Sequence, residues 1–127
     1  MQKIFLATFL LLLNFFSHGQ QTYHVSKLQS GTYNASSQKW AWNDEEITDI
    51  TIKINGNVFS ISNKSNSVIT TKDIILENNN GVEKKTIWNA SDQNGKECNI
   101  IWATTLASGK QSISLYYLHI TVIYKLD

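Results

Sequence analysis

The spacing of glycine along the chain is the feature that most limits what it can fold into. After Gln20 the sequence holds five glycines, each directly preceded by serine or asparagine: Ser30-Gly31, Asn55-Gly56, Asn80-Gly81, Asn94-Gly95 and Ser108-Gly109. Such pairs tolerate positive φ angles and are typical of tight turns. The stretches between them are rich in Ile, Val, Thr, Trp and Tyr, which favour strands, and they lack a helical period. The sequence therefore predicts an all-β domain, a single antiparallel meander closing into a small sandwich or barrel of about eight strands.

The first hairpin is predicted from an alternating pattern. Ile50, Ile52 and Ile54 alternate with polar residues, which is typical of a strand with one buried face. A two-residue turn at Asn55-Gly56 would place Ile52 opposite Phe59. Because opposed residues share a face, this turn gives one apolar face and one polar face.

The C-terminal half predicts a core sheet of four strands, at 84–90, 96–104, 111–117 and 120–126. We place its turns at Gln93-Asn94-Gly95, Ser108-Gly109 and Leu118-His119. One face then collects Trp88, Ala90, Cys98, Ile100, Trp102, Ile113, Leu115, Tyr117, Ile120, Val122 and Tyr124. We expect this face to be buried, since a one-residue change in any loop would move part of the set to the opposite face. The last turn lacks typical turn residues, so the alternative is one long strand with a bulge there.

Residues 1–19 have the layout of a secretory signal peptide. A positively charged start is followed by an apolar run from Ile4 to Phe16 and then by small residues. The run is shorter than the ~20 residues that a transmembrane helix needs. We expect cleavage near Gly19 and a secreted or periplasmic protein with one all-β domain over 20–127, without a transmembrane segment. The alternative is an uncleaved membrane anchor.

The composition argues against several classes of function. The formal net charge is +1 and all eleven basic residues are lysine. We therefore expect no nucleic-acid partner, because arginine is the residue that usually contacts phosphates and base edges. Cys98 is the single cysteine, which excludes an intrachain disulfide. It alternates with Ile100 and Trp102, so we expect it to be buried and reduced. The spacing of His, Cys, Asp and Glu matches no metal motif, and the sequence predicts no cofactor and no catalytic residue.

Several residues of the C-terminal half carry a resemblance. Trp88, Asp92, Gly95-Lys96 and Cys98, followed by two tyrosine-rich closing strands, resemble small secreted β proteins of Gram-negative bacteria, a family without assigned function. The resemblance spans roughly Trp40 to Tyr124. It implies export and a β fold, and it implies no catalytic or binding residue.

Trp40 and Trp42 are the candidate ligand-binding residues. They are two positions apart, so both fall on one face if the segment is extended, and the acidic run Asp44-Glu45-Glu46 follows them. Tryptophan faces beside carboxylates can stack on sugars and accept their hydroxyl hydrogen bonds. The alternative is that both indoles cover one end of the core while the acids lie in a solvated loop.

A second pair of candidates, Cys98 and His119, fall opposite each other in the expected register. A Cys–His contact can activate a thiolate. Burial among apolar neighbours raises a thiol pKa, however, so we expect Cys98 to be inert.

Three functions fit these observations. We expect an exported, non-enzymatic β module that binds a protein or an envelope component. The first alternative is a small lipocalin-like barrel that holds an apolar ligand, since Ser30-Gly31-Thr32-Tyr33 is similar to the Gly-x-Trp of that family. The second alternative is a carbohydrate-binding module that uses Trp40 and Trp42. An interior cavity would favour the lipocalin-like barrel, and an exposed tryptophan pair would favour the carbohydrate module.

Overall fold

The computed structural model describes residues 20–62 and 66–127, which form one antiparallel sheet of nine strands. The strands are β1 (Gln21–Asn34), β2 (Lys39–Trp42), β3 (Glu46–Asn55), β4 (Val58–Ser62), β5 (Ser67–Asn79), β6 (Glu83–Asp92), β7 (Glu97–Thr105), β8 (Gln111–Tyr116) and β9 (Ile120–Leu126). The predicted all-β meander is confirmed, with one strand more than expected. The predicted signal peptide and its cleavage point near Gly19 lie outside the described residues. In the part of the chain that is described, no helix is long and apolar enough to cross a membrane.

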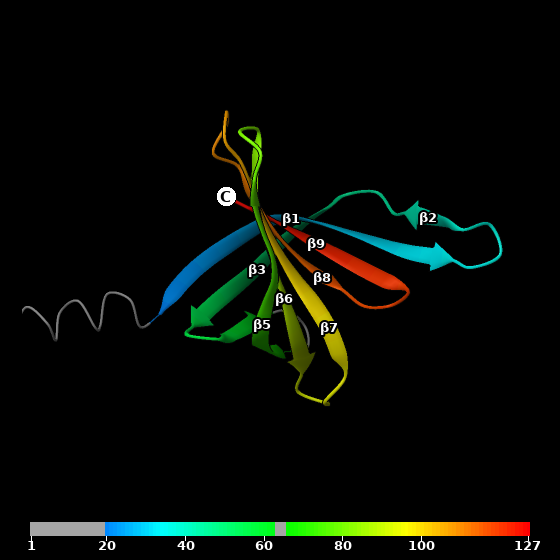
Figure 1. Ribbon diagram of the computed structural model, residues 1–127, viewed down its shortest axis with the longest axis horizontal. Helices are drawn as coiled ribbons and strands as arrows, with labels where there is room; N and C mark the ends of the chain where they lie inside the picture. The colour runs from blue at the N-terminus through cyan, green and yellow to red at the C-terminus, as the bar shows by residue number, and fades with distance from the viewer. Residues whose placement is uncertain (1–19, 63–65) are drawn as a thin grey trace, which may run out of the picture.

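The sheet curls until its two ends meet, so that it nearly closes into a ring (Figure 1). From β3 to β9 each strand pairs with the next one along the chain. β1 closes the ring because it pairs with β3 on one edge and with β9 on the other: Val25 faces both Ile50 and Leu126. Of the two architectures that the sequence left open, the structure has the barrel-like one.

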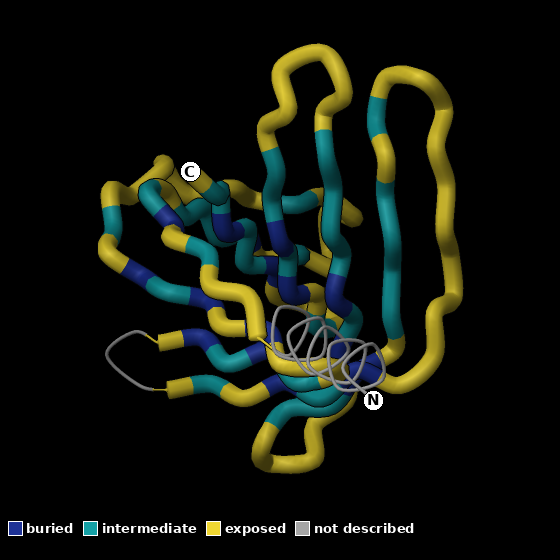
Figure 2. The backbone as a smooth tube through the Cα atoms, turned by 90° about the vertical axis from the view of Figure 1, so that its left-hand side faces the viewer, coloured by how far each residue is buried: buried dark blue, intermediate teal, exposed yellow. Residues whose placement is uncertain are grey.

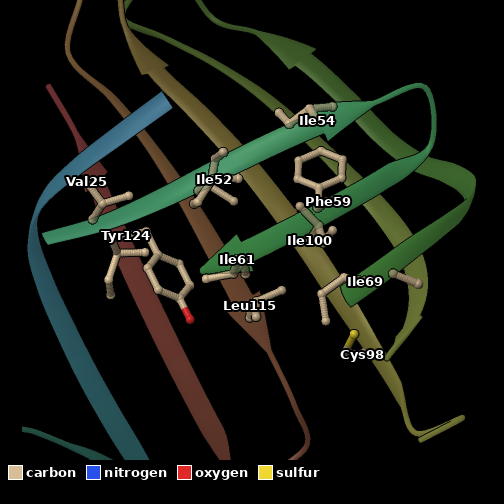
Figure 3. Close-up of a cluster of buried hydrophobic side chains, with 13 residues drawn as sticks. Val25, Ile52, Ile54, Phe59, Ile61, Ile69, Cys98, Ile100, Leu115 and Tyr124 are labelled. Atoms are coloured by element: carbon tan, nitrogen blue, oxygen red, sulfur yellow. The ribbon is translucent and has the colours of Figure 1, made fainter. Parts of the chain in front are cut away.

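The interior of the ring is filled mainly with branched aliphatic side chains, together with Phe59 and Tyr124 (Figure 3). The largest fully buried ones are Ile52, Ile61, Ile69, Ile100, Ile113 and Val25. Burying one such side chain stabilises the fold by about 1.5–3 kcal/mol relative to leaving it exposed. The buried residues lie on the stretches of strand that form the ring, whereas the tips of the long hairpins that project from it are exposed (Figure 2).

β1 changes the face it presents to the interior halfway along its length. A β-bulge between Val25 and Lys27 shifts the pairing with both β3 and β9. A bulge adds one residue, so the side chains after it alternate in the opposite sense. Val25 is fully buried before the bulge and Leu28 packs against the core after it. Gly31 and Tyr33 consequently lie on the outer face of the ring.

The predicted C-terminal meander is confirmed in its strands and in two of its three turns. Trp88 pairs with Ile100 around a loop in which Gly95 has a φ angle of 79°. Leu115 pairs with Val122, and the Tyr117 N–H donates to the Ile120 carbonyl at 2.8 Å. The chain therefore reverses at Leu118-His119, and the alternative of one bulged strand is wrong.

The register expected at Asn55-Gly56 is wrong by two residues. Asn55 pairs with Val58, so Ile52 lies opposite Ile61 and not opposite Phe59. Gly56 is the first central residue of the turn, with a φ angle of 60°, and a type II′ turn favours glycine at this position.

The register expected at Ser108-Gly109 is wrong in the same way. The Thr105 N–H donates to the Lys110 carbonyl at 2.9 Å, so the loop is longer than two residues. Trp102 consequently pairs with Ile113 and not with Leu115. Both errors are an even number of residues, so every side chain stays on the face that was predicted for it.

The predicted apolar face is therefore largely confirmed as the core. Its buried members are Ala90, Cys98, Ile100, Ile113, Leu115 and Tyr124, and its partly buried members are Trp88, Trp102, Tyr117 and Val122. Ile120 is the exception, because it is the first residue of β9 and remains 46% exposed.

Candidate functional site

Trp40 and Trp42 lie on the outer face of the ring, where they are part of a larger group of aromatic side chains. We call this group the outer aromatic strip and define it as Tyr33, Trp40, Trp42, Tyr116 and His119. β1, β2 and the end of β8 with its turn supply these residues, and the closure between β1 and β9 brings them together. The alternative in which both indoles cover one end of the core is wrong.

A row of paired residues across four strands forms the floor of the strip. Trp42 in β2 pairs with Gly31 in β1, Gly31 pairs with Thr121 in β9, and Thr121 pairs with Tyr116 in β8. Paired residues share a face, so all four lie on the outside. Thr121 is nevertheless only 8% exposed, and Gly31 is buried as well. The aromatic rings therefore cover this part of the sheet.

Gly31 is the residue that lets Trp42 lie against the sheet. The sequence predicted a turn at Ser30-Gly31, and that prediction is wrong, because Gly31 lies within β1. A Cβ atom at this position would lie 2.6 Å from Cε3 and 2.8 Å from Cζ3 of Trp42. The indole occupies the space that any other side chain would need. Glycine in a strand often marks such a close approach.

The rings of the strip contact one another. Trp40 is central, with ring centroids 5.9 Å from Trp42, 5.4 Å from Tyr33 and 5.7 Å from Tyr116. Tyr33 in turn stacks on His119, with an angle of 8° between the ring planes. These separations fall in the range that aromatic pairs prefer, so the rings hold each other in place.

The strip is open to solvent although its rings are packed together. Trp42 is 47% exposed and Tyr116 is 37% exposed. Leu118, which lies in the turn after Tyr116, is also exposed. Clustered exposed apolar side chains of this kind usually mark a binding surface.

One residue of the acidic run beside the tryptophans, Glu45, already forms a hydrogen bond with another part of the protein. The Lys125 ammonium group donates to Glu45 Oε2 at 2.7 Å, and this hydrogen bond holds the pKa of Glu45 below its usual value. The Asn43 side chain donates to Ser30 Oγ at 2.9 Å and fixes the segment after Trp42. We therefore do not count Glu45 among the groups available to a ligand.

Cys98 and His119 do not meet. The register of β7 and β8, continued past Asn99 and Tyr116, places Tyr117 opposite Cys98, while His119 stacks on Tyr33. Cys98 is 7% exposed, as predicted, and burial raises the pKa of its thiol. A buried thiol with a raised pKa is a poor nucleophile.

A hollow of about 440 Å³ adjoins the strip next to Tyr116. It is lined by Lys72, Asp73, Asn89, Ala90, Glu97, Cys98, Asn99, Tyr116 and Leu118. Asn99 pairs with Tyr116 on one side and with Asn89 on the other, so the two amides continue the outer row of the strip. The hollow therefore adds polar groups to the aromatic surface.

Sequence reasoning found two of the five residues of the strip and missed Tyr33, Tyr116 and His119. A Trp40–Tyr33 contact could have been inferred from a hairpin around Asn34, whose Oδ1 accepts from the N–H of Ser36 at 2.9 Å. The contacts with β8 depend on ring closure, for which the sequence has no local signal.

Comparisons with protein-family models, with curated proteins and with solved structures found no match to this chain. Among the described residues, no group of three or more His, Cys, Asp or Glu side chains could hold a metal ion. The site must therefore be interpreted from its own geometry.

Proposed function

We propose that this protein is an exported, non-enzymatic module that binds a carbohydrate on the outer aromatic strip. The observation that carries the proposal is the partly exposed pair Trp40 and Trp42 on the outside of the sheet, whose ring centroids are 5.9 Å apart. The face of an aromatic ring carries a partial negative charge, and the C–H groups of a sugar ring carry a weak positive charge, so the two attract each other. An envelope glycan would be one form of the envelope partner that the sequence suggests.

The strip is suited to binding because little order has to be imposed on it. Trp40 touches three other rings, and the space above Gly31 fixes Trp42. Side chains that are already ordered lose little entropy when a ligand arrives, which favours affinity. Tryptophan and tyrosine also combine large contact areas with few rotatable bonds.

An apolar ligand inside the ring has less support. The interior positions of β3, β4 and β7 are filled by Ile52, Ile61 and Ile100, each at most 1% exposed. A lipocalin-like site needs a cavity where these side chains lie. A protein partner, which the sequence also suggests, would leave every oligosaccharide in the experiment below unbound.

The test is calorimetric titration of the described domain with soluble oligosaccharides of different sugar composition. We expect saturable binding to at least one of them, reduced at least about fivefold in Trp42→Ala, because a nucleic-acid base stacked on an aromatic side chain contributes roughly 1–3 kcal/mol and a stacked sugar is expected to contribute on the same scale. Ile75→Ala is the matched control, since Ile75 is 53% exposed and lies outside the strip. Binding that is unchanged in Trp42→Ala, or the absence of binding to every oligosaccharide, would contradict the proposal.

A further inference from the structure

The amide groups of Asn89 and Asn99 have a fixed orientation. Asn99 Nδ2 donates to the Trp88 carbonyl at 3.2 Å, and a carbonyl can only accept, so the amide nitrogen must point there. The same nitrogen donates to Asn89 Oδ1 at 3.1 Å, which fixes the Asn89 amide in turn. Asn99 therefore presents Oδ1 as a free acceptor, and Asn89 presents Nδ2 as a free donor, among the hydrogen bonds of the described residues.

An acceptor beside a donor is complementary to a group that both donates and accepts, such as a secondary amide, whose donor and acceptor are two separate atoms. The N–H of such a group can donate to Asn99 Oδ1 while its carbonyl accepts from Asn89 Nδ2. The charged residues around the hollow, Lys72, Asp73 and Glu97, have both signs. A neutral amide suits this rim better than a carboxylate or an ammonium group, because no single-sign field is present to attract a charge.

The amide pair lies within reach of a sugar stacked on the strip. Asn99 is one strand from Tyr116 and Asn89 is two strands away, which corresponds to about 5 and 10 Å. A substituent on a sugar ring that covers Tyr116 would enter the hollow beside it.

We infer that the carbohydrate is N-acetylated and that its acetamido group binds to Asn89 and Asn99 in the hollow beside Tyr116. This inference rests on the proposed function, since it names the sugar class for the same site. Two neutral hydrogen bonds are together worth about a factor of ten in affinity. That factor is the preference we expect for an N-acetylated chain over its unsubstituted counterpart.

The experiment compares a β-1,4-linked N-acetylglucosamine tetramer with cellotetraose of the same length, titrated against the wild type and against Asn89→Asp. The substitution removes the Nδ2 donor and keeps Oδ1, which accepts from Asn99. We expect the wild type to prefer the N-acetylated tetramer about tenfold and Asn89→Asp to bind both tetramers within about twofold. Asn89→Asp should lose no more affinity for cellotetraose than the charge control Asn78→Asp does.

Asn78→Asp is the control for the added charge, because Asn78 is exposed on β5 and lies outside the hollow. It should keep the preference for the N-acetylated tetramer. Equal binding of both tetramers by the wild type, or a preference that survives in Asn89→Asp, would overturn the inference while leaving the proposed function intact. If neither tetramer binds and no other oligosaccharide does, both fail together.

Discussion

The two faces of the same curled sheet both carry large apolar side chains, but they use them differently. On the inner face Ile52, Ile61 and Ile100 are at most 1% exposed, and their burial accounts for the fold. On the outer face Trp40 and Trp42 contact each other and the sheet, yet Trp42 is still 47% exposed. Burial in the core accounts for the position of the inner set. The outer set leaves apolar surface exposed in the free protein, and this exposure is the observation on which the proposed glycan site rests.

The largest expected effect on stability comes from a substitution on the inner face of β7. Ile100 is fully buried, so Ile100→Ala should lower the free energy of unfolding by about 2–5 kcal/mol through lost burial and a cavity. Its neighbour Ile101 faces outward and is half-buried, so Ile101→Ala should cost clearly less. Chemical denaturation of both variants measures the difference. Equal losses would show that the outer face is as well covered as the interior.

A smaller effect is expected at Gly31, where the lack of a side chain makes room for Trp42 on the outer face. Gly31→Ala places a Cβ atom 2.6 Å from the Trp42 ring, so the indole must move, at a cost of about 1–3 kcal/mol. Glycan affinity should fall at the same time. In the double variant with Trp42→Ala the clash is gone, so the two losses should not add. If the stabilities prove additive, Trp42 does not rest on Gly31.

The sequence predicts the inner face better than the outer one for a physical reason. Side chains alternate with a period of two along a strand, so the two-residue errors at Asn55-Gly56 and Ser108-Gly109 left every face correct. The outer strip depends on the bulge after Val25, which reverses the faces of β1. It also depends on the pairing of β1 with β9, which joins residues far apart in sequence. Neither event has a local signal, so the Ser30-Gly31 pair predicts a turn where the chain continues as a strand.

The smallest effect should come from a surface contact that ties the C-terminus to β1 and β3. Both ring nitrogens of His24 face carboxylates, Nδ1 toward Asp127 and Nε2 toward Asp49 at 2.8 Å. The hydrogen bond to Asp127 and then the one to Asp49 raise the pKa of His24 above 6.5. The same contact with His24 lowers the pKa of Asp127.

The pH dependence follows from these directions. Because the pKa of His24 is higher in the folded protein than in the unfolded chain, its contacts stabilise the fold fully below about pH 6.5. This stabilisation is lost as the pH rises through the pKa of the folded state. The lowered pKa of Asp127 contributes stability above about 3.9 that is lost as the pH falls through the lower folded value. Thermal unfolding should therefore show a small decrease in Tm from about pH 5.5 to about pH 8.5 that is absent in His24→Gln. An identical decrease in the variant would exclude His24 as its source.

The most direct test of the difference between the two faces uses the four tryptophans themselves. Trp40 and Trp42 belong to the outer strip, whereas Trp88 and Trp102 pack against the core. Each indole N–H gives its own signal in a two-dimensional NMR spectrum, which can be followed during titration with the N-acetylglucosamine tetramer. We predict that the signals of Trp40 and Trp42 shift in a saturable manner while those of Trp88 and Trp102 stay in place. Shifts confined to Trp88 and Trp102, or no shift at any indole with any oligosaccharide, would contradict the account.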